Sequence, residues 1–317
     1  MLFATLVRLT KGDRIKLRNP ESMTRRTILG GAAAFLSATA SSNAQSNRLP
    51  VKKGLLWGML PAKLSPLEKF QMLKECGFEE MECHTTPDKA DAEAILDASK
   101  KTGVRVHSVM NSDHWKYPLS ASDRATVDKC IAGMETSLRN AKLWGADTVL
   151  LVPAVVNPEV GYAQAWERSQ KEIRKMIPLA KECKVIIAVE NVWNKFLLSP
   201  VEFARYVDDF KSPWVKSYFD VGNIVMYGYP QDWIRTLGPR IAKVHFKDFK
   251  FKGDPSVKGR SNADWVNLRE GMIDWKAVHK AFADIGYKGT VTVELSSGDA
   301  AYLKDLSGRV DQILNGD

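Results

Sequence analysis

From Gly54 onward the sequence repeats one pattern eight times: a short run rich in β-branched and aromatic residues, followed by a longer stretch of helical character. This alternation is typical of parallel sheets, because two parallel strands must be joined by a crossover of about a dozen residues or more. Eight units without an internal break, and no glycine-rich phosphate-binding motif after the first strand, predict an α/β protein with a single-domain closed (β/α)8 TIM barrel rather than a doubly wound open sheet. The expected strands begin at residues 54, 78, 104, 148, 185, 215, 242 and 290.

Local signals mark the ends of several expected helices. Ser65, Pro66 and Glu68 have the spacing of a capping box with proline at the first helical position, and Gly77 follows the same helix. Ser199 precedes another proline and a glutamate in the same arrangement. These signals predict helix starts directly after Ser65 and Ser199.

The segment before the barrel has the composition of an export signal. Residues 1–44 hold most of the chain's excess positive charge, and the pair Arg25-Arg26 is followed by a weakly apolar stretch, Gly30 to Ala40, and by small residues ending at Ala44. This order is typical of a twin-arginine (Tat) signal, which would take the folded protein to the periplasm. A basic tail without a targeting role is the alternative interpretation.

Two further boundaries follow from the same region. Met23 stands directly before the arginine pair, so residues 1–22 would be an artefact if translation starts there. Residues 45–53 are polar and are expected to form a linker, which leaves 54–317 for the barrel.

The formal net charge of +9 does not by itself indicate a nucleic-acid partner. Outside the first 44 residues, basic and acidic residues alternate along the chain, which favours a mixed solvated surface. The apolar stretch in the signal is too short to span a bilayer, so no membrane anchor is expected. The sequence leaves open both the oligomeric state, a homo-oligomer included, and the pairing of the four cysteines, whose spacing matches no metal-binding motif. They are Cys76, Cys83, Cys130 and Cys183.

Four acidic or imidazole side chains stand near the ends of four successive apolar runs. An ionised carboxylate in such a run is costly unless it is paired, hydrogen-bonded or bound to a metal. Because the carboxyl ends of parallel barrel strands meet at one rim, the four side chains should converge there. Three carboxylates and one imidazole suit one divalent ion such as Mn, Mg, Co or Zn. The expected ligands are Glu190, Asp220, His245 and Glu294.

Two of these residues also suit acid–base catalysis. Glu190 and Glu294 come from the fifth and eighth expected strands, so a substrate could lie between them while they exchange a proton next to its carbonyl. A metal-stabilised enediolate would be the intermediate. Asp220 and His245 would complete the metal shell.

The same residues carry a family resemblance. The runs ENVWNKFLLSP from Glu190, FDVGN from Phe219, YGYPQDWIRTLGPRIAKVHFKDFK from Tyr227 and TVELS from Thr292 resemble the xylose-isomerase-like barrel superfamily. Within it, the chain is most similar to the sugar (phosphate) isomerase/epimerase group, which includes ketose 3-epimerases, pentulose-phosphate 3-epimerases and hydroxypyruvate isomerases. The resemblance covers residues 54–312. It implies the four metal ligands and the acid–base pair given above.

One position departs from the family pattern. Tagatose- and psicose-type 3-epimerases place a histidine three residues after the metal-binding aspartate, where this chain has Asn223. An asparagine can hydrogen-bond a hydroxyl group but does not titrate. This departure weakens the case for epimerisation of a free ketose as the particular reaction.

Other residues near the strand ends are candidates for substrate contacts. The tryptophans offer flat faces to a sugar, the asparagines can bind hydroxyl groups, and the basic side chains can bind substrate oxygens or, for the arginine, a phosphate. For each of them packing or a solvated charge is the alternative. The candidates are His107, Trp115, Asn191, Trp193, Asn223, Lys247 and Arg260.

The sequence thus predicts a metal-dependent sugar isomerase or epimerase, and a periplasmic location favours an unphosphorylated sugar. A lyase that opens 3-keto-glycosides would use the same proton abstraction, and a non-catalytic sugar-binding barrel would have no need of two glutamates beside one ion. A nuclease of the same superfamily would need a metal cluster richer in histidine, whereas the whole chain has five histidines.

Overall fold

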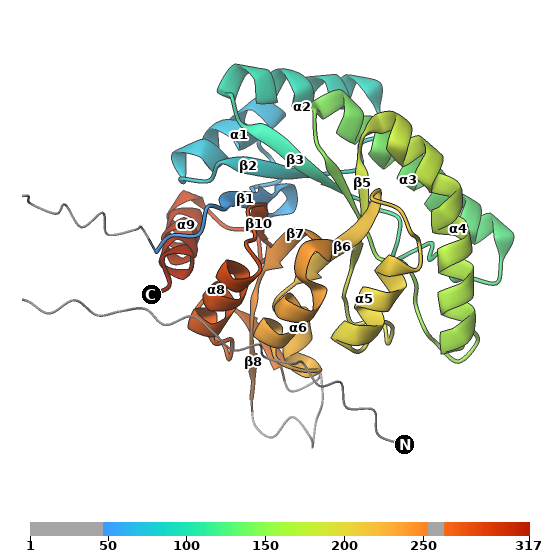
Figure 1. The fold of residues 1–317 in the computed structure, drawn as a ribbon. Helices are drawn as coiled ribbons and strands as arrows, with labels where there is room; N and C mark the ends of the chain where they lie inside the picture. Colours follow the sequence, from blue (N-terminus) through green and yellow to red (C-terminus); the bar gives the residue numbers. More distant parts are fainter. Residues whose placement is uncertain (1–46, 253–262) are drawn as a thin grey trace, which may run out of the picture. The chain divides into compact units, whose positions relative to one another are not determined.

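The computed structural model of the protein describes residues 47–252 and 263–317. The export segment at residues 1–44 and Arg260 therefore lie outside the described residues. The described part of the chain forms a closed barrel of eight parallel strands in the order β1-β10-β7-β6-β5-β4-β3-β2, which confirms the predicted fold (Figure 1). The barrel strands are β1(Lys52–Leu56), β2(Glu80–His84), β3(Arg105–Met110), β4(Thr148–Leu151), β5(Ile186–Glu190), β6(Val215–Asp220), β7(Ile241–Phe246) and β10(Thr290–Val293).

Helices surround the barrel and connect its strands (Figure 1). Ser65 caps the first helix as predicted: its side chain accepts from the Glu68 backbone N–H, and the Glu68 carboxylate accepts from that of Ser65. Ser199 caps α5 through Glu202 N–H. Gly77 follows α1 with a φ of 87°, a left-handed value that glycine adopts without strain. The helices are α1(Pro66–Glu75), α2(Lys89–Thr102), α3(Arg124–Trp144), α4(Tyr162–Cys183), α5(Pro200–Asp208), α6(Pro230–Leu237), α8(Trp275–Asp284) and α9(Ala300–Asn315).

The barrel fold begins before residue 54, where the sequence analysis placed its start. Leu49 and Val51 are buried, and the Leu49 backbone N–H donates to the Leu314 carbonyl at the end of α9. Lys52 already pairs with β10. The sequence did not reveal this earlier start, because the expected linker is polar overall and only its few apolar residues pack into the barrel fold.

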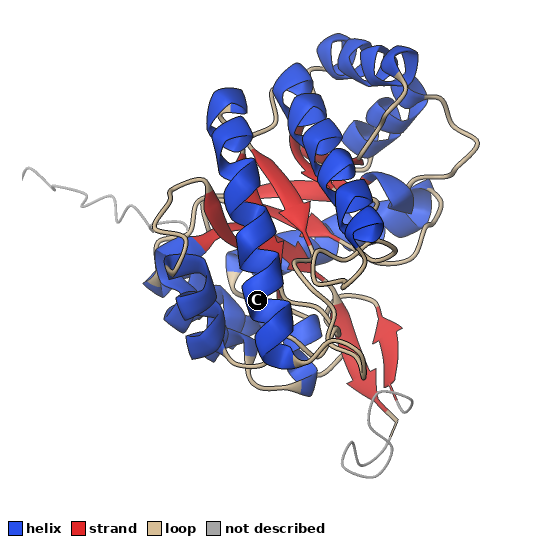
Figure 2. Cartoon of the chain, turned by 90° about the vertical axis from the view of Figure 1, so that its right-hand side faces the viewer, coloured by secondary structure: helices blue, strands red, loops and turns tan. Residues whose placement is uncertain are grey.

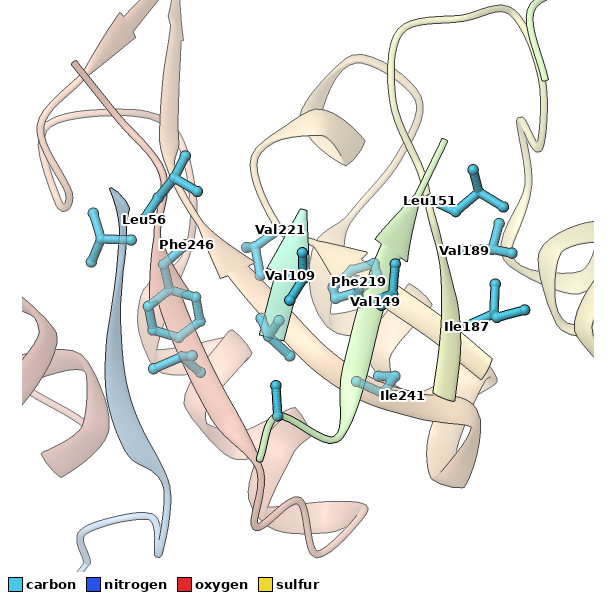
Figure 3. Packing of buried hydrophobic residues seen from close by; sticks show 14 of the residues in the cluster. Leu56, Val109, Val149, Leu151, Ile187, Val189, Phe219, Val221, Ile241 and Phe246 are labelled. Atoms are coloured by element: carbon cyan, nitrogen blue, oxygen red, sulfur yellow. The ribbon is translucent and has the colours of Figure 1, made fainter. Parts of the chain in front are cut away.

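Strand alternation separates an apolar layer from a polar barrel interior. Successive strand residues point to opposite faces, so Phe246 packs against Trp275 and Phe282 of α8 while its neighbour His245 points inward. Figure 3 shows the apolar layer, in which Phe219 and Phe246 are fully buried. The chemically active side chains therefore come from the inward faces and the strand ends.

A two-stranded antiparallel hairpin follows β7 on the carboxyl side of the barrel (Figure 2). It consists of β8(Asp248–Phe251) and β9(Ala263–Val266) and was not predicted. Asp248 holds its base, because its carboxylate accepts from the backbone N–H groups of Phe249 and Arg269 and from the indole N–H of Trp275.

Two sequence expectations concern the rest of the described chain. The four cysteines are buried and unpaired, so they are small core residues and form no disulfides with one another. Among the residues described, no helix combines the length and apolar character that a membrane crossing requires.

Candidate active site

The four predicted ligands converge at the carboxyl rim of the barrel. Glu190 and Asp220 are the last residues of β5 and β6, His245 is the penultimate residue of β7, and Glu294 directly follows β10. One ligand atom from each residue lies within 4.8 Å of those from the other three. The strand register explains this convergence, since Asp220 pairs with His245 and Thr292 of β10 pairs with the same histidine.

One ring nitrogen of His245 faces all three carboxylates. Its Nδ1 atom lies 3.0 Å from Glu190 Oε1, 2.9 Å from Glu294 Oε2 and 3.9 Å from Asp220 Oδ2. Burial disfavours a charged imidazole, but the surrounding carboxylates, Glu294 foremost, outweigh burial and raise the pKa of His245 well above its ordinary value. The site therefore strongly attracts positive charge.

The two proposed acid–base residues have different electrostatic surroundings. Burial, together with the negative charge of Glu294, raises the pKa of Glu190 to about 7. Burial would also raise the pKa of Glu294, but the positive charges of Lys247 and His245 hold it well below its ordinary value. Glu190 can thus exist in both protonation states near neutral pH.

Lys247 is an integral member of this cluster. Its Nζ atom lies 2.8 Å from Asp220 Oδ2 and 2.7 Å from Glu294 Oε2. Gly222 allows this placement, because a Cβ atom there would lie 2.6 Å from Lys247 Cγ and 2.8 Å from the Lys247 carbonyl oxygen. The lysine therefore reaches the cluster through a space that only glycine leaves open.

The cluster fits a divalent cation. Asp220 Oδ2 and Glu294 Oε2 are buried atoms without a hydrogen bond of good geometry among the described residues, even though Lys247 lies within ion-pairing distance of both. Three carboxylates around one imidazole and one ammonium group leave spare acceptor atoms. Oxygen atoms with one histidine nitrogen are the ligands that Mn, Mg, Co and Zn ions accept.

A cavity of about 300 Å³ lies above the cluster, with Glu190 and Glu294 in its wall. Four predicted substrate residues line it: Trp115, Trp193, Asn223 and Lys247. Trp193 is held in place by a hydrogen bond from its indole N–H to the Asn223 carbonyl, 3.0 Å away. Asp220 and His245 lie fully buried and do not line the cavity.

Two predicted substrate residues are placed elsewhere. His107 lies in the middle of β3, fully buried, where its Nε2 atom is 2.9 Å from Thr292 Oγ1 and a Cβ atom at Gly54 would approach it to 2.9 Å. It fills the barrel interior because it precedes the strand end by three residues. Asn191 bridges β5 and β6 instead, because its amide donates to the Asp220 carbonyl and accepts from the Asp220 backbone N–H.

The cavity also contains residues beyond the predicted substrate contacts. His84 ends β2, and its buried Nε2 atom has no hydrogen-bond partner among the described residues. His114 accepts from the Val152 backbone N–H through Nδ1. Trp265 reaches the cavity from β9, and no signal pointed to it because the hairpin itself was not predicted. Asn111, Ser112, Met110 and Val192 complete the wall.

Comparison with known proteins identifies the family of the chain. Residues 70–309 match the family model described as xylose isomerase-like TIM barrel. The L-ribulose-5-phosphate 3-epimerase UlaE of Escherichia coli O1:K1 is 27% identical over 270 residues, which cover 80% of this chain and 90% of that protein.

Solved structures share the fold at lower identity. D-psicose 3-epimerase crystallised in the presence of D-fructose has a TM-score of 0.68 at 18% identity and covers 84% of this chain and 100% of its own. The 3-keto-D-glucoside 4-epimerase YcjR from E. coli has a TM-score of 0.67 at 15% identity, over 81% of this chain and 98% of its own. Because the family model matches most of its length, the chain belongs to the xylose isomerase-like TIM-barrel family.

Proposed function

We propose that the protein is a metal-dependent sugar epimerase that removes and returns a proton next to a substrate carbonyl. The observation that carries this proposal is the position of Glu190 and Glu294. Their carboxylates lie within about 3 Å of the same His245 nitrogen and both line the cavity. A substrate in this cavity meets two carboxylates from strands that are three steps apart in the barrel.

The residues divide the chemistry between them. Glu190, Asp220, His245 and Glu294 would hold the ion, which when bound would polarise the substrate carbonyl and offset the charge that develops on its oxygen. Glu294 is ionised, because Lys247 and His245 hold its pKa well below the ordinary value, and it accepts the proton that leaves the substrate. Glu190, whose pKa of about 7 allows it to carry a proton near neutral pH, returns a proton from its own side, and the two residues exchange roles in the reverse direction. Lys247 neutralises part of the acidic cluster.

The relatives support the class of reaction. The curated relative is named a 3-epimerase of a ketose phosphate, and the solved structures include a ketose epimerase and a keto-glucoside epimerase. The predicted class of enzyme, a sugar epimerase, is confirmed by these relatives. All three names describe inversion at a carbon of a sugar that bears a carbonyl group.

Exchange with solvent tests the proposal. Incubation of candidate keto sugars with the purified protein in heavy water should place deuterium on the carbon next to the carbonyl. Glu190→Gln and Glu294→Gln should each lower the exchange rate by about a hundredfold or more, the usual scale for loss of a general acid or base. Product formed without solvent-derived label would indicate hydride transfer and would refute the assignment.

Glu80→Gln is the matched control. Glu80 is a glutamate of similar burial on β2, but it binds Arg105 and Thr290 at the opposite end of the barrel. Its substitution should leave the exchange rate close to that of the wild type. An equal loss of exchange in this control would mean that the catalytic variants act through stability.

A further inference from the structure

We propose that Trp115 and Trp265 form an outer subsite for a second, uncharged sugar ring, so that the substrate is an unphosphorylated glycoside rather than a single ketose. This inference rests on the proposed function, because it assumes that the first sugar lies against Glu190 and Glu294. It goes beyond that function by assigning the part of the substrate that does not react.

The first argument is the exposure of these two side chains. The sequence has nine tryptophans, all within the described residues, and only Trp115 and Trp265 are largely exposed, at 52% and 43%. Both line the same cavity. Large aromatic rings are normally buried for most of their surface, so two exposed ones beside one cavity indicate a ligand that covers them.

The second argument is their position around the mouth. Trp115 follows β3, whereas Trp265 belongs to the hairpin that follows β7. These two barrel strands are four steps apart in the closed order of eight, so the tryptophans reach the cavity from opposite sides of the barrel. A ring that leaves the cavity toward solvent would pass between them.

The third argument is that both tryptophans already contact neighbouring aromatic rings. Trp265 stacks on Trp193 with ring centroids 4.9 Å apart and an interplanar angle of 17°, and it also contacts the edge of Phe249. Trp115 contacts the ring of His114, which is anchored by the Val152 backbone. Side chains that are fixed before binding lose less conformational entropy when a ligand covers them.

Trp265 also connects the subsite to the reactive groups. Lys247 Nζ lies 5.0 Å from the centre of its ring and 2.7 Å from Glu294 Oε2. The outer ring would therefore bind directly next to the sugar that reacts. A cavity of about 300 Å³ is at the lower end of the range for small-molecule sites, which suits one sugar unit inside and the next one at the mouth.

The charge of the cavity wall favours a neutral ligand. Among the described lining residues the only ammonium or guanidinium group is that of Lys247, and it is already paired with Asp220 and Glu294. Burial lowers the pKa of His84 and, to about 3, that of His114, so both are neutral at pH 7. The remaining polar groups, such as the unpartnered Nε2 of His84, suit hydroxyl groups.

The test compares two keto-glycosides that differ in the second ring, together with a free ketose and its phosphate. Solvent exchange is measured with 3-keto-cellobiose, with methyl 3-keto-β-glucoside, and with L-ribulose and its 5-phosphate. The wild type should have a kcat/KM for the disaccharide about tenfold above that for the methyl glycoside, and Trp115→Ala or Trp265→Ala should each reduce this ratio by about fivefold, the scale of one aromatic contact. Trp265→Phe keeps an aromatic face and should therefore retain most of the kcat/KM ratio between the disaccharide and the methyl glycoside.

Three results would overturn the subsite: equal kcat/KM for the disaccharide and the methyl glycoside, an unchanged ratio in both alanine variants, or a preference for L-ribulose 5-phosphate over every neutral glycoside. Tyr229→Ala is the control, because this exposed side chain lines a different cavity and should leave the ratio unchanged. An equal decrease of the kcat/KM ratio in Tyr229→Ala would also overturn the assignment of the outer subsite.

A binding measurement separates this inference from the proposed function. Calorimetric titration with cellobiose, which bears no ketone, should show binding to the wild type and binding about fivefold weaker in each alanine variant. If no substrate exchanges but cellobiose binds in this way, the proposed epimerase is wrong and the subsite stands. If methyl 3-keto-β-glucoside exchanges but cellobiose does not bind, the subsite is wrong and the epimerase stands.

Discussion

The Nε2 atom of His245 lies 2.7 Å from Oε2 of Glu82, and both side chains are fully buried. Because Glu82 accepts the Nε2 proton, the other ring nitrogen is left to face Glu190, Asp220 and Glu294. Glu82 is itself held by the hydroxyl groups of Ser108, at 2.5 Å, and Tyr218, at 3.1 Å. A carboxylate behind a ligating histidine commonly fixes its tautomer and increases its basicity.

Glu82→Gln should therefore weaken the binding of Mn²⁺ without removing any ligand. Loss of such a carboxylate lowers metal affinity by about 10- to 100-fold, and calorimetric titration of the metal-free protein with Mn²⁺ measures it. Glu80→Gln, two residues earlier on β2, is the control and should bind Mn²⁺ as the wild type does. Unchanged affinity in Glu82→Gln would show that the His245 tautomer does not depend on this contact.

Removal of two ligands should abolish binding altogether. The double variant Asp220→Ala with His245→Ala keeps two carboxylates, too few to hold a divalent ion firmly. In the wild type, Mn²⁺ at a hundred times its Kd should stabilise the folded state by about 2.7 kcal/mol, seen as a higher Tm. The double variant should show neither this increase nor bound metal by elemental analysis. A full complement of metal in it would place the ion elsewhere.

The sequence predicted most of the metal cluster but little of the cavity wall. Glu190, Asp220, His245 and Glu294 could be found because charged groups at the ends of apolar strands are unusual, and parallel strands bring their ends together. His107 was selected by the same reasoning. Strand alternation, however, shows only that its side chain points into the barrel, and not how far that side chain lies from the rim. Asn191 shows a second limit, because its amide is used by the backbone of the next strand.

Other parts of the site depend on contacts between distant segments. Trp265 belongs to a hairpin whose two strands, DFKF and ADWV, are short and separated by the charged sequence KGDPSVKGRSN. Glu82 is 163 residues from His245 in sequence, and only the closed barrel brings them together. Pairings of this kind leave no local pattern that periodicity can detect.

Gly222→Ala should impair catalysis while the barrel stays folded. The added Cβ atom would meet Lys247 at both Cγ and the carbonyl oxygen, and the backbone atom cannot move without shifting the segment that follows β7. Overpacking of this kind costs about 1–3 kcal/mol, and displacement of Lys247 should lower the solvent-exchange rate by about tenfold or more. Gly308→Ala is the control, because its new Cβ would meet nothing within 4 Å. Equal exchange rates in both variants would contradict a role for the Lys247 position.

The last prediction concerns the location of the protein, which limits its substrate. We propose that Arg25-Arg26, with the weakly apolar stretch and small residues that follow, directs export by the twin-arginine route with cleavage near Ala44. Replacement of both arginines by lysine keeps the charge and should block export.

Fractionation of the producing cells and N-terminal sequencing of the periplasmic protein measure the result. Replacement of Arg139 and Arg205 by lysine is the matched control, because it makes the same chemical change at two exposed positions of the barrel, outside the motif, and should leave export intact. Phosphorylated sugars are mostly intracellular, so a periplasmic enzyme would meet neutral glycosides, in agreement with the outer subsite. The export proposal is wrong if the Arg25-Arg26 variant still reaches the periplasm or if the wild type remains uncut in the cytoplasm. In either case the location no longer favours an unphosphorylated substrate, and only the residues that line the cavity support that preference.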